Sequence, residues 1–228
     1  MNGNRFLFTI IIVFLTLGCA TPRLGFPEKT MEIPVPVTLF TDVADTGVLD
    51  NRLPMGSKDV WELLYREHMV TLLGKINSGE IQMLINPEFV DKAKKTDLFI
   101  VDPDFVVRLN AEYTKSEQDT SAFSGYNFSD FQASIPAKYI LAFTVDQWGY
   151  TVSNTPTEDG PFMVFCIRLI DKESNESVWE YSKRYHTVIS SALKGTRREV
   201  LDPVDLEGAY KKLVSKALKD FFIWLNSK

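Results

Sequence analysis

The residues best suited to acid-base chemistry or metal binding in this chain of 228 are its two histidines, His68 and His186. Neither has a cysteine or a second histidine at zinc-ligand spacing. Glu67-His68 also lacks the His-Glu-x-x-His pattern that places two imidazoles on one helical face. The sequence contains no nucleophile elbow, phosphate-binding loop or dinucleotide-binding glycine motif. We therefore expect structural or surface roles for both histidines, and no catalytic residue, metal or cofactor.

Two acidic clusters contain the oxygen ligands that calcium prefers. They are Asp42, Asp45 and Asp50, around a glycine, and Asp102 and Asp104, around a proline. Neither follows the twelve-residue calcium loop, and aspartate next to glycine or proline is common in turns. We interpret both clusters as turns.

The amino-terminal segment has the pattern of an export signal, with Arg5 ahead of an apolar run over residues 6–17. A membrane-spanning helix needs about 20 apolar residues, so this run is too short to be a good permanent anchor. The segment Leu15-Thr16-Leu17-Gly18-Cys19 resembles a bacterial lipobox, whose cysteine thiol takes a diacylglycerol. The alternative is an incidental Cys19 thiol at the end of an uncleaved helix.

The lipobox resemblance implies a cleaved and anchored protein. Residues 1–18 would be removed as a signal peptide, and Cys19 would carry acyl chains. Each methylene of these chains that is buried in the bilayer stabilises membrane binding by about 0.8 kcal/mol. Ala20 stands where aspartate usually retains Gram-negative lipoproteins in the inner membrane, so the resemblance implies the outer membrane, facing the periplasm. Residues 19–34 are rich in proline and are expected to form a semi-extended tether. Residues 35–228 are expected to form one periplasmic domain.

The second cysteine of the chain is Cys166. If Cys19 is lipidated, Cys166 has no disulfide partner within the exported chain. It lies in the apolar run Phe162-Met163-Val164-Phe165-Cys166-Ile167. We therefore expect it to be buried, in preference to a reactive or bridging role.

Hydrophobic periodicity predicts alternating strands and helices followed by a meander. The expected strands cover residues 35–40, 81–85, 98–101, 139–152, 162–170 and 178–189, and the expected helices cover 57–76, 87–95 and the segment opened by Asp202-Pro203. Residues 105–113 fit a helix or a strand, and we expect the helix. The core-facing stripe of the first helix is expected to be Val60, Trp61, Leu64, Tyr65, Leu72, Leu73 and Ile76. The predicted fold class is α+β, with a mixed, largely antiparallel sheet, helices packed mainly on one face and a C-terminal amphipathic helix.

A long loop is expected at residues 114–136, and aromatic side chains interleave there with Ser, Gly and Asn. They are Phe123, Tyr126, Phe128 and Phe131. Aromatic rings on an adaptable loop are typical of a recognition surface, so these four residues are candidates for binding a partner. The alternative is that the rings fold back and fill the core.

A basic loop near the C-terminal helix contains Lys194, Arg197 and Arg198. These side chains are candidates for contact with an anionic glycan or lipid headgroup. The alternative is an ordinary solvated turn.

Residues 137–225 carry a resemblance to a group of periplasmic lipoproteins. The features are "AKYI" at 137–140, "LID" at 169–171 and "VW" at 178–179, each at the start or end of a predicted strand. The pattern is similar to the domain shared by the TolB amino-terminal domain, the curli-secretion lipoprotein and the penicillin-binding-protein activators. The segment 114–136 departs from this pattern. The resemblance implies an α+β periplasmic domain without catalytic residues.

These features together predict a non-enzymatic, lipid-anchored accessory or assembly factor that binds another envelope protein. The net charge of -5 argues against nucleic acid as a partner, because nucleic-acid binders carry a basic surface. The alternative is a carrier of a small apolar or glycan ligand, in a pocket between sheet and helix lined by Trp148, Phe165 and Trp179. A hydrolase would need a polar cleft with convergent titratable groups.

Overall fold

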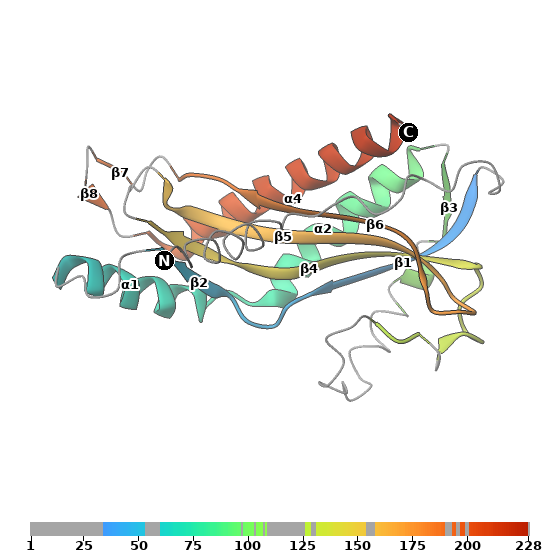
Figure 1. Ribbon diagram of the computed structural model, residues 1–228, viewed down its shortest axis with the longest axis horizontal. Coiled ribbons are helices and arrows are strands. Elements are labelled where there is room, and N and C mark those ends of the chain that lie inside the picture. The colour runs from blue at the N-terminus through green and yellow to red at the C-terminus, as the bar shows by residue number, and fades with distance from the viewer. Residues whose placement is uncertain are drawn as a thin grey trace, which may run out of the picture.

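The chain forms an α+β fold in which helices cover one face of a mixed six-stranded sheet (Figure 1). The computed structural model describes residues 34–52, 60–96, 98–102, 104–106, 108, 126–128, 131–153, 158–189, 193–194, 197–198 and 201–227. The strands of the main sheet are β1 (Val35–Val43), β2 (Val48–Asn51), β3 (Phe99–Val101), β4 (Tyr139–Val152), β5 (Gly160–Asp171) and β6 (Ser177–His186). The helices are α1 (Val60–Leu73), α2 (Ser78–Lys94) and α4 (Pro203–Asn226), and β7 (Leu193–Lys194) pairs with β8 (Arg197–Arg198) in a separate short hairpin. The predicted fold class is confirmed.

The sheet has the order β3-β1-β4-β5-β6, with β2 also paired to β4. Strands β4, β5 and β6 form the predicted antiparallel meander, whereas β1, β2 and β3 make parallel pairs. A bulge in β4 between Val145 and Gln147 shifts the register of the meander at its centre. At the β2 end, a Cβ on Gly149 would lie 1.8 Å from the Val48 carbonyl oxygen, so only glycine permits this approach of the two strands.

The larger core lies between the sheet and the helices. Leu141 and Phe143 of β4 alternate with Ile140 and Ala142, so the first pair faces the helices and the second pair faces the opposite side. Helix α2 covers the side of β1 and β3, and α4 covers β5 and β6 (Figure 1). Helices packed on one face therefore bury the apolar rows that the strand alternation predicted.

Helix α4 begins as the sequence predicted. The Asp202 side chain caps it by accepting a hydrogen bond from the Asp205 backbone N–H at 2.9 Å, and Pro203 occupies the first turn. The predicted apolar stripe, including Leu213 and Phe221, is buried.

The predicted strand at 81–85 is wrong, because these residues belong to α2. Asn77 accepts a hydrogen bond from the Gly79 N–H at 2.8 Å and so begins a new helix, whereas the sequence suggested only the end of the preceding one. The buried positions are spaced four apart, as one helical face requires: Ile81, Ile85, Phe89 and Ala93. Pro87 lies inside this helix and not in the first turn of a short one.

Other boundaries differ in smaller ways. The polar stretch after β1 contains strand β2, which pairs in parallel with the end of β4. The described residues of the predicted 105–113 helix, 105–106 and 108, are helical. None of the helices in the described ranges is both long and apolar enough to cross a bilayer.

Candidate interaction surfaces

Helix α1 carries the most concentrated exposed apolar surface of the described residues. Four of its side chains remain open to solvent: Val60 at 64 %, Leu63 at 44 %, Leu64 at 50 % and Val70 at 57 %. Their spacing of three, four and ten residues from Val60 places them along one side of a helix. We call these four residues the α1 stripe, and Glu67 lies in the middle of it.

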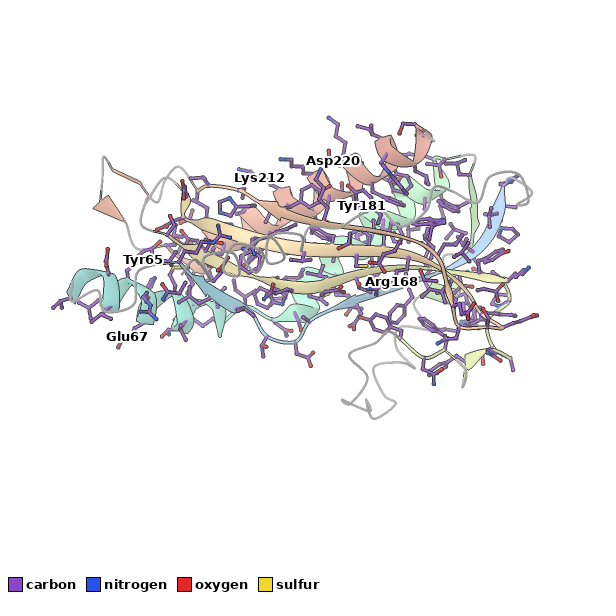
Figure 2. All side chains as sticks on the ribbon, viewed as in Figure 1. Tyr65, Glu67, Arg168, Tyr181, Lys212 and Asp220 are labelled. Carbon is purple, nitrogen blue, oxygen red and sulfur yellow. The ribbon has the colours of Figure 1, made fainter. Side chains whose placement is uncertain are left out.

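The opposite side of α1 attaches the helix to the core. Tyr65 and Met69 are buried there, and the Tyr65 and Tyr150 hydroxyls lie 3.0 Å apart. His68 Nε2 lies 3.0 Å from the Leu201 carbonyl oxygen. Figure 2 shows Tyr65 on the side of α1 toward the sheet and Glu67 on the outward side. The α1 stripe is therefore a second apolar face of the helix, free of the contacts that hold it in place.

The prediction that Val60 and Leu64 face the core is wrong. Tyr65, Leu72 and the rest of the predicted stripe are buried, except for Trp61, whose side chain lies outside the described set. In the sequence, the apolar residues of this segment fall on two opposite sides of a helix. This distribution was the signal that the helix has an exposed apolar face as well as a core face. The predicted core-facing stripe contains residues of both faces.

The α1 stripe lies at one end of the long sheet. The register pairs Val37 with Tyr139 at the start of β1 and Asn51 with Val152 at the end of β2. Helix α1 follows β2 and therefore lies at the end opposite to Val35, where the described chain begins. Figure 1 shows α1 and the β7–β8 hairpin toward this same end of the molecule.

The aromatic segment fills the second face of the sheet. Phe128 is fully buried, and its ring meets Phe40 edge to face at 5.1 Å. It belongs to a small core with Ile135 and Ile140, against which Tyr126 and Phe131 are partly buried. For Phe128 the structure agrees with the alternative, in which the ring folds back and fills the core, because burial of a large apolar ring outweighs its exposure on a loop. Phe123 lies outside the described residues.

Tyr126 anchors the segment to β1. Its hydroxyl donates to Asp42 Oδ2 at 2.9 Å. Burial raises the pKa of Asp42, although the hydrogen bond from Tyr126 opposes this change. Asp42 thus holds the aromatic segment in place, and it does not act as a free acidic ligand.

Two ion-pair groups follow the same open face, beyond the aromatic segment. Arg168 Nε lies 3.0 Å from Glu180 Oε2, and its Nη2 lies 3.7 Å from Asp146 Oδ2. At the other group, Arg184 binds Asp50. Alternating charges along neighbouring strands cover the middle of the sheet on the face that none of the described helices covers.

Asp50 has a second basic partner, because Arg52 Nη2 lies 3.0 Å from its Oδ2. Burial alone would raise the pKa of Asp50, but the hydrogen bonds from Arg52 and Arg184 outweigh it and lower this pKa. The same two arginines, after burial, lower the pKa of His186. Asp50 is therefore the acceptor of an ion-pair cluster.

Cys166 is buried, as the sequence predicted. Burial raises the pKa of its thiol well above the ordinary range, so almost no thiolate forms near neutral pH. The described residues contain no group of three or more His, Cys, Asp or Glu side chains that could hold a metal ion.

The three rings that would line a ligand pocket are packed against other side chains. Trp148, Phe165 and Trp179 are each no more than 2 % exposed. Trp148 Nε1 donates to the Ala44 carbonyl oxygen at 2.6 Å, and its ring meets Tyr210 edge to face. All three rings belong to the core between the sheet and the helices.

Comparison with known proteins gives only remote likenesses. No protein family and no curated protein match the sequence. A Xanthomonas campestris protein of an uncharacterised family aligns over 90 % of this chain and 94 % of its own, with 10 % identity and a TM-score of 0.42. A lipoprotein of Neisseria meningitidis aligns over 82 % and 98 %, with 13 % identity and a TM-score of 0.34. The PelC dodecamer of Paraburkholderia phytofirmans aligns over 78 % and 83 %, with 12 % identity and a TM-score of 0.33.

These TM-scores are too low to establish a common fold, so the functional argument rests on this chain's own residues. Of the sequence-predicted site residues, Cys19 and Phe123 lie outside the described ranges, as do residues 1–18 and most of the predicted tether. The basic residues Lys194, Arg197 and Arg198 belong to β7 and β8, and their side chains are not described. The structure adds the α1 stripe, which no sequence motif marked.

Proposed function

We propose that this chain is a non-enzymatic, lipid-anchored accessory factor on the periplasmic face of the outer membrane, and that it binds another envelope protein through the α1 stripe. The observation that carries the proposal is the stripe itself. Four large apolar side chains are exposed along one helix that a different face fixes to the core. A contiguous exposed apolar surface on a folded domain is typical of a protein contact site.

Anchoring at Cys19 would present this surface away from the membrane. Residue 34 follows residue 19 by fifteen positions, so the connecting chain reaches at most about 50 Å. Strand β4, with 14 residues, is roughly 45 Å long. Because the chain enters the sheet at Val35, the end that carries α1 can lie a full sheet length beyond the point of attachment, within reach of a second envelope protein.

The stripe also suggests the chemistry of the partner. A helix that offers apolar side chains at spacings of three and four residues fits a hydrophobic groove. Glu67, exposed between Leu64 and Val70, would favour a groove with a basic group at its centre. The partner site should therefore be apolar with one central cation.

A photo-crosslinking amino acid at Leu64 tests the proposal in intact cells. We expect one discrete adduct, which mass spectrometry identifies as an envelope protein. The matched control is the same amino acid at Met83, which is 68 % exposed on α2 and lies outside the stripe. Adducts of equal yield and composition at both positions would contradict a specific site on α1.

Substitution tests the contact energetically. Leu63→Ser with Leu64→Ser should abolish copurification of the crosslinked partner, with little change in the melting temperature, because both side chains are about half exposed. Met83→Ser should leave copurification unchanged. Full retention of the partner by the double variant would refute the assignment.

The membrane anchor is tested separately by Cys19→Ser. We expect this variant to remain unprocessed and to lose the acyl chains that hold the mature protein in the outer-membrane fraction. A Cys19→Ser protein that stays in the membrane fraction at mature size would refute lipidation at this residue.

A further inference from the structure

Strand β6 forms an open edge of the main sheet. It pairs with β5 on one side, and within the described ranges no strand pairs with its other side. Trp179 and Tyr185 point into the core, whereas Lys183 and Arg184 are exposed. A ten-residue edge of this kind offers a row of backbone groups to another strand.

The register shows which backbone groups face outward. The Thr187 N–H donates to the Pro161 carbonyl oxygen at 3.1 Å, in the same alignment that pairs His186 with Phe162. In an antiparallel pair, alternate residues direct both their N–H and C=O groups to the same neighbour. The odd-numbered residues of β6 therefore bond β5, and the N–H and C=O groups of Glu180, Ser182 and Arg184 face outward.

We propose that two copies of this chain pair antiparallel through their β6 edges, with a two-fold axis at Ser182. In this register Ser182 lies opposite Ser182 of the second copy, and every outward N–H meets an outward C=O. Glu180 lies opposite Arg184 of the second copy, and the symmetry repeats this pair on the other side of the axis. The inference does not depend on the proposed partner or on the lipid anchor.

Charge complementarity selects this register and disfavours its neighbours. A two-fold axis at Glu180 or at Arg184 would place two like charges directly opposite each other, which destabilises a sheet. An axis at Tyr181 would leave Glu180 opposite a serine, and an axis at Lys183 would oppose two lysines. Only the axis at Ser182 places Glu180 opposite an arginine.

The surrounding charges fit the same register. Within one copy, Glu180 Oε2 pairs with Arg168 Nε at 3.0 Å, and Arg184 pairs with Asp50. Across the proposed interface the charges would continue to alternate in sign. On the helix-covered side, Lys183 would lie opposite Tyr181 of the second copy, where an ammonium and an aromatic ring attract each other.

Cysteine cross-linking tests the register directly. Paired residues of this type have Cα atoms about 5.5 Å apart, inside the range for a disulfide. Ser182→Cys in the full-length protein should therefore form a disulfide-linked dimer under mild oxidation of membranes. The experiment needs the Cys166→Ala background, because Cys166 lies opposite Ser182 on β5 and would compete within one copy.

Two controls fix the alignment. Arg184→Cys alone should form no dimer, because the two cysteines would lie four residues, about 13 Å, apart along the paired strands. Co-expression of Arg184→Cys with Glu180→Cys, both in the Cys166→Ala background, should restore a mixed dimer. Cross-linking of Arg184→Cys alone, or none in the mixed sample, would overturn the proposed register.

A second measurement does not depend on cysteine chemistry. Ser182→Pro removes an N–H that faces away from β5 and bonds no other described residue, so the fold should persist while the edge is blocked. We expect the detergent-solubilised wild type to sediment as a dimer and Ser182→Pro as a folded monomer that melts in one cooperative transition. A wild-type monomer without cross-linking at residue 182, or a Ser182→Pro dimer, would overturn the proposal.

Discussion

The buried position of Phe128 gives the prediction that separates a core role from a binding role. On a recognition loop, Phe128→Ala would remove partner binding and leave the fold intact. In the structure this ring is fully buried on the second face of the sheet, against Phe40 and Ile140. We therefore expect Phe128→Ala to destabilise the whole protein.

The structure sets the size of the effect. Truncation of a fully buried phenylalanine costs about 3–5 kcal/mol of unfolding free energy, from lost burial and the cavity left behind. The edge-to-face pair with Phe40, at 5.1 Å, is included in this loss. Because the cluster has only six buried members among the described residues, we expect a value near the lower limit, about 3 kcal/mol.

The assay is equilibrium unfolding by urea of the full-length protein without its lipid, as Cys19→Ser, monitored by tryptophan fluorescence. Phe131→Ala is the matched control, because this ring is only partly buried in the same segment. We expect a loss of about 1 kcal/mol for the control. The m-value should not change, because the native fold is retained.

A loss below about 1 kcal/mol for Phe128→Ala would refute the reasoning, because a fully buried ring cannot be removed so cheaply. Equal losses for the Phe128 and Phe131 variants would also contradict it. They would mean that the depth of burial does not distinguish the two rings.

Three further changes test the architecture. Gly149→Ala places a Cβ 1.8 Å from the Val48 carbonyl oxygen, so thermal melting should show destabilisation of at least about 2 kcal/mol, and an unchanged midpoint would contradict the close approach. Asp50 has a lowered pKa in the folded state, so its stabilisation is complete above its ordinary pKa of about 4 and is lost as the pH falls below it. Between about pH 5 and pH 2.5, the unfolding free energy should therefore depend less on pH for Asp50→Asn than for the wild type. Identical slopes of unfolding free energy against pH would contradict the ion pair. Burial raises the pKa of Cys166, so a thiol reagent at neutral pH should react with the Cys166 thiol only after the protein is denatured. Rapid reaction of this thiol in the native protein would contradict its burial.

The meander and the last helix were predictable because their signals are local. Alternation in β5 and in the part of β4 before its bulge places Leu141 and Phe165 on one face whatever their neighbours are. Asp202 and Pro203 mark the start of α4 through backbone hydrogen bonding and a fixed φ angle. Such elements carry most of their information within a few residues.

The second helix was misread because its start signal is also a stop signal. Asn77 and Gly79 are typical both of a helix end and of an N-cap. Short apolar runs such as Ile81 to Ile85 do not distinguish strand from helix by periodicity alone. Ile85 and Phe89 both pack into the core beneath the sheet, and this packing favours the helix over a strand.

Sequence by itself determined the α+β class, the order of the meander, the cap of α4, the burial of Cys166 and the candidate lipobox at Cys19. Tertiary structure alone decided that Phe128 fills the second face of the sheet, that Leu64 faces solvent and that β6 is left as an edge. The physical reason is that burial depends on what packs across from a residue. The same apolar side chain is core or contact surface according to whether another element covers it.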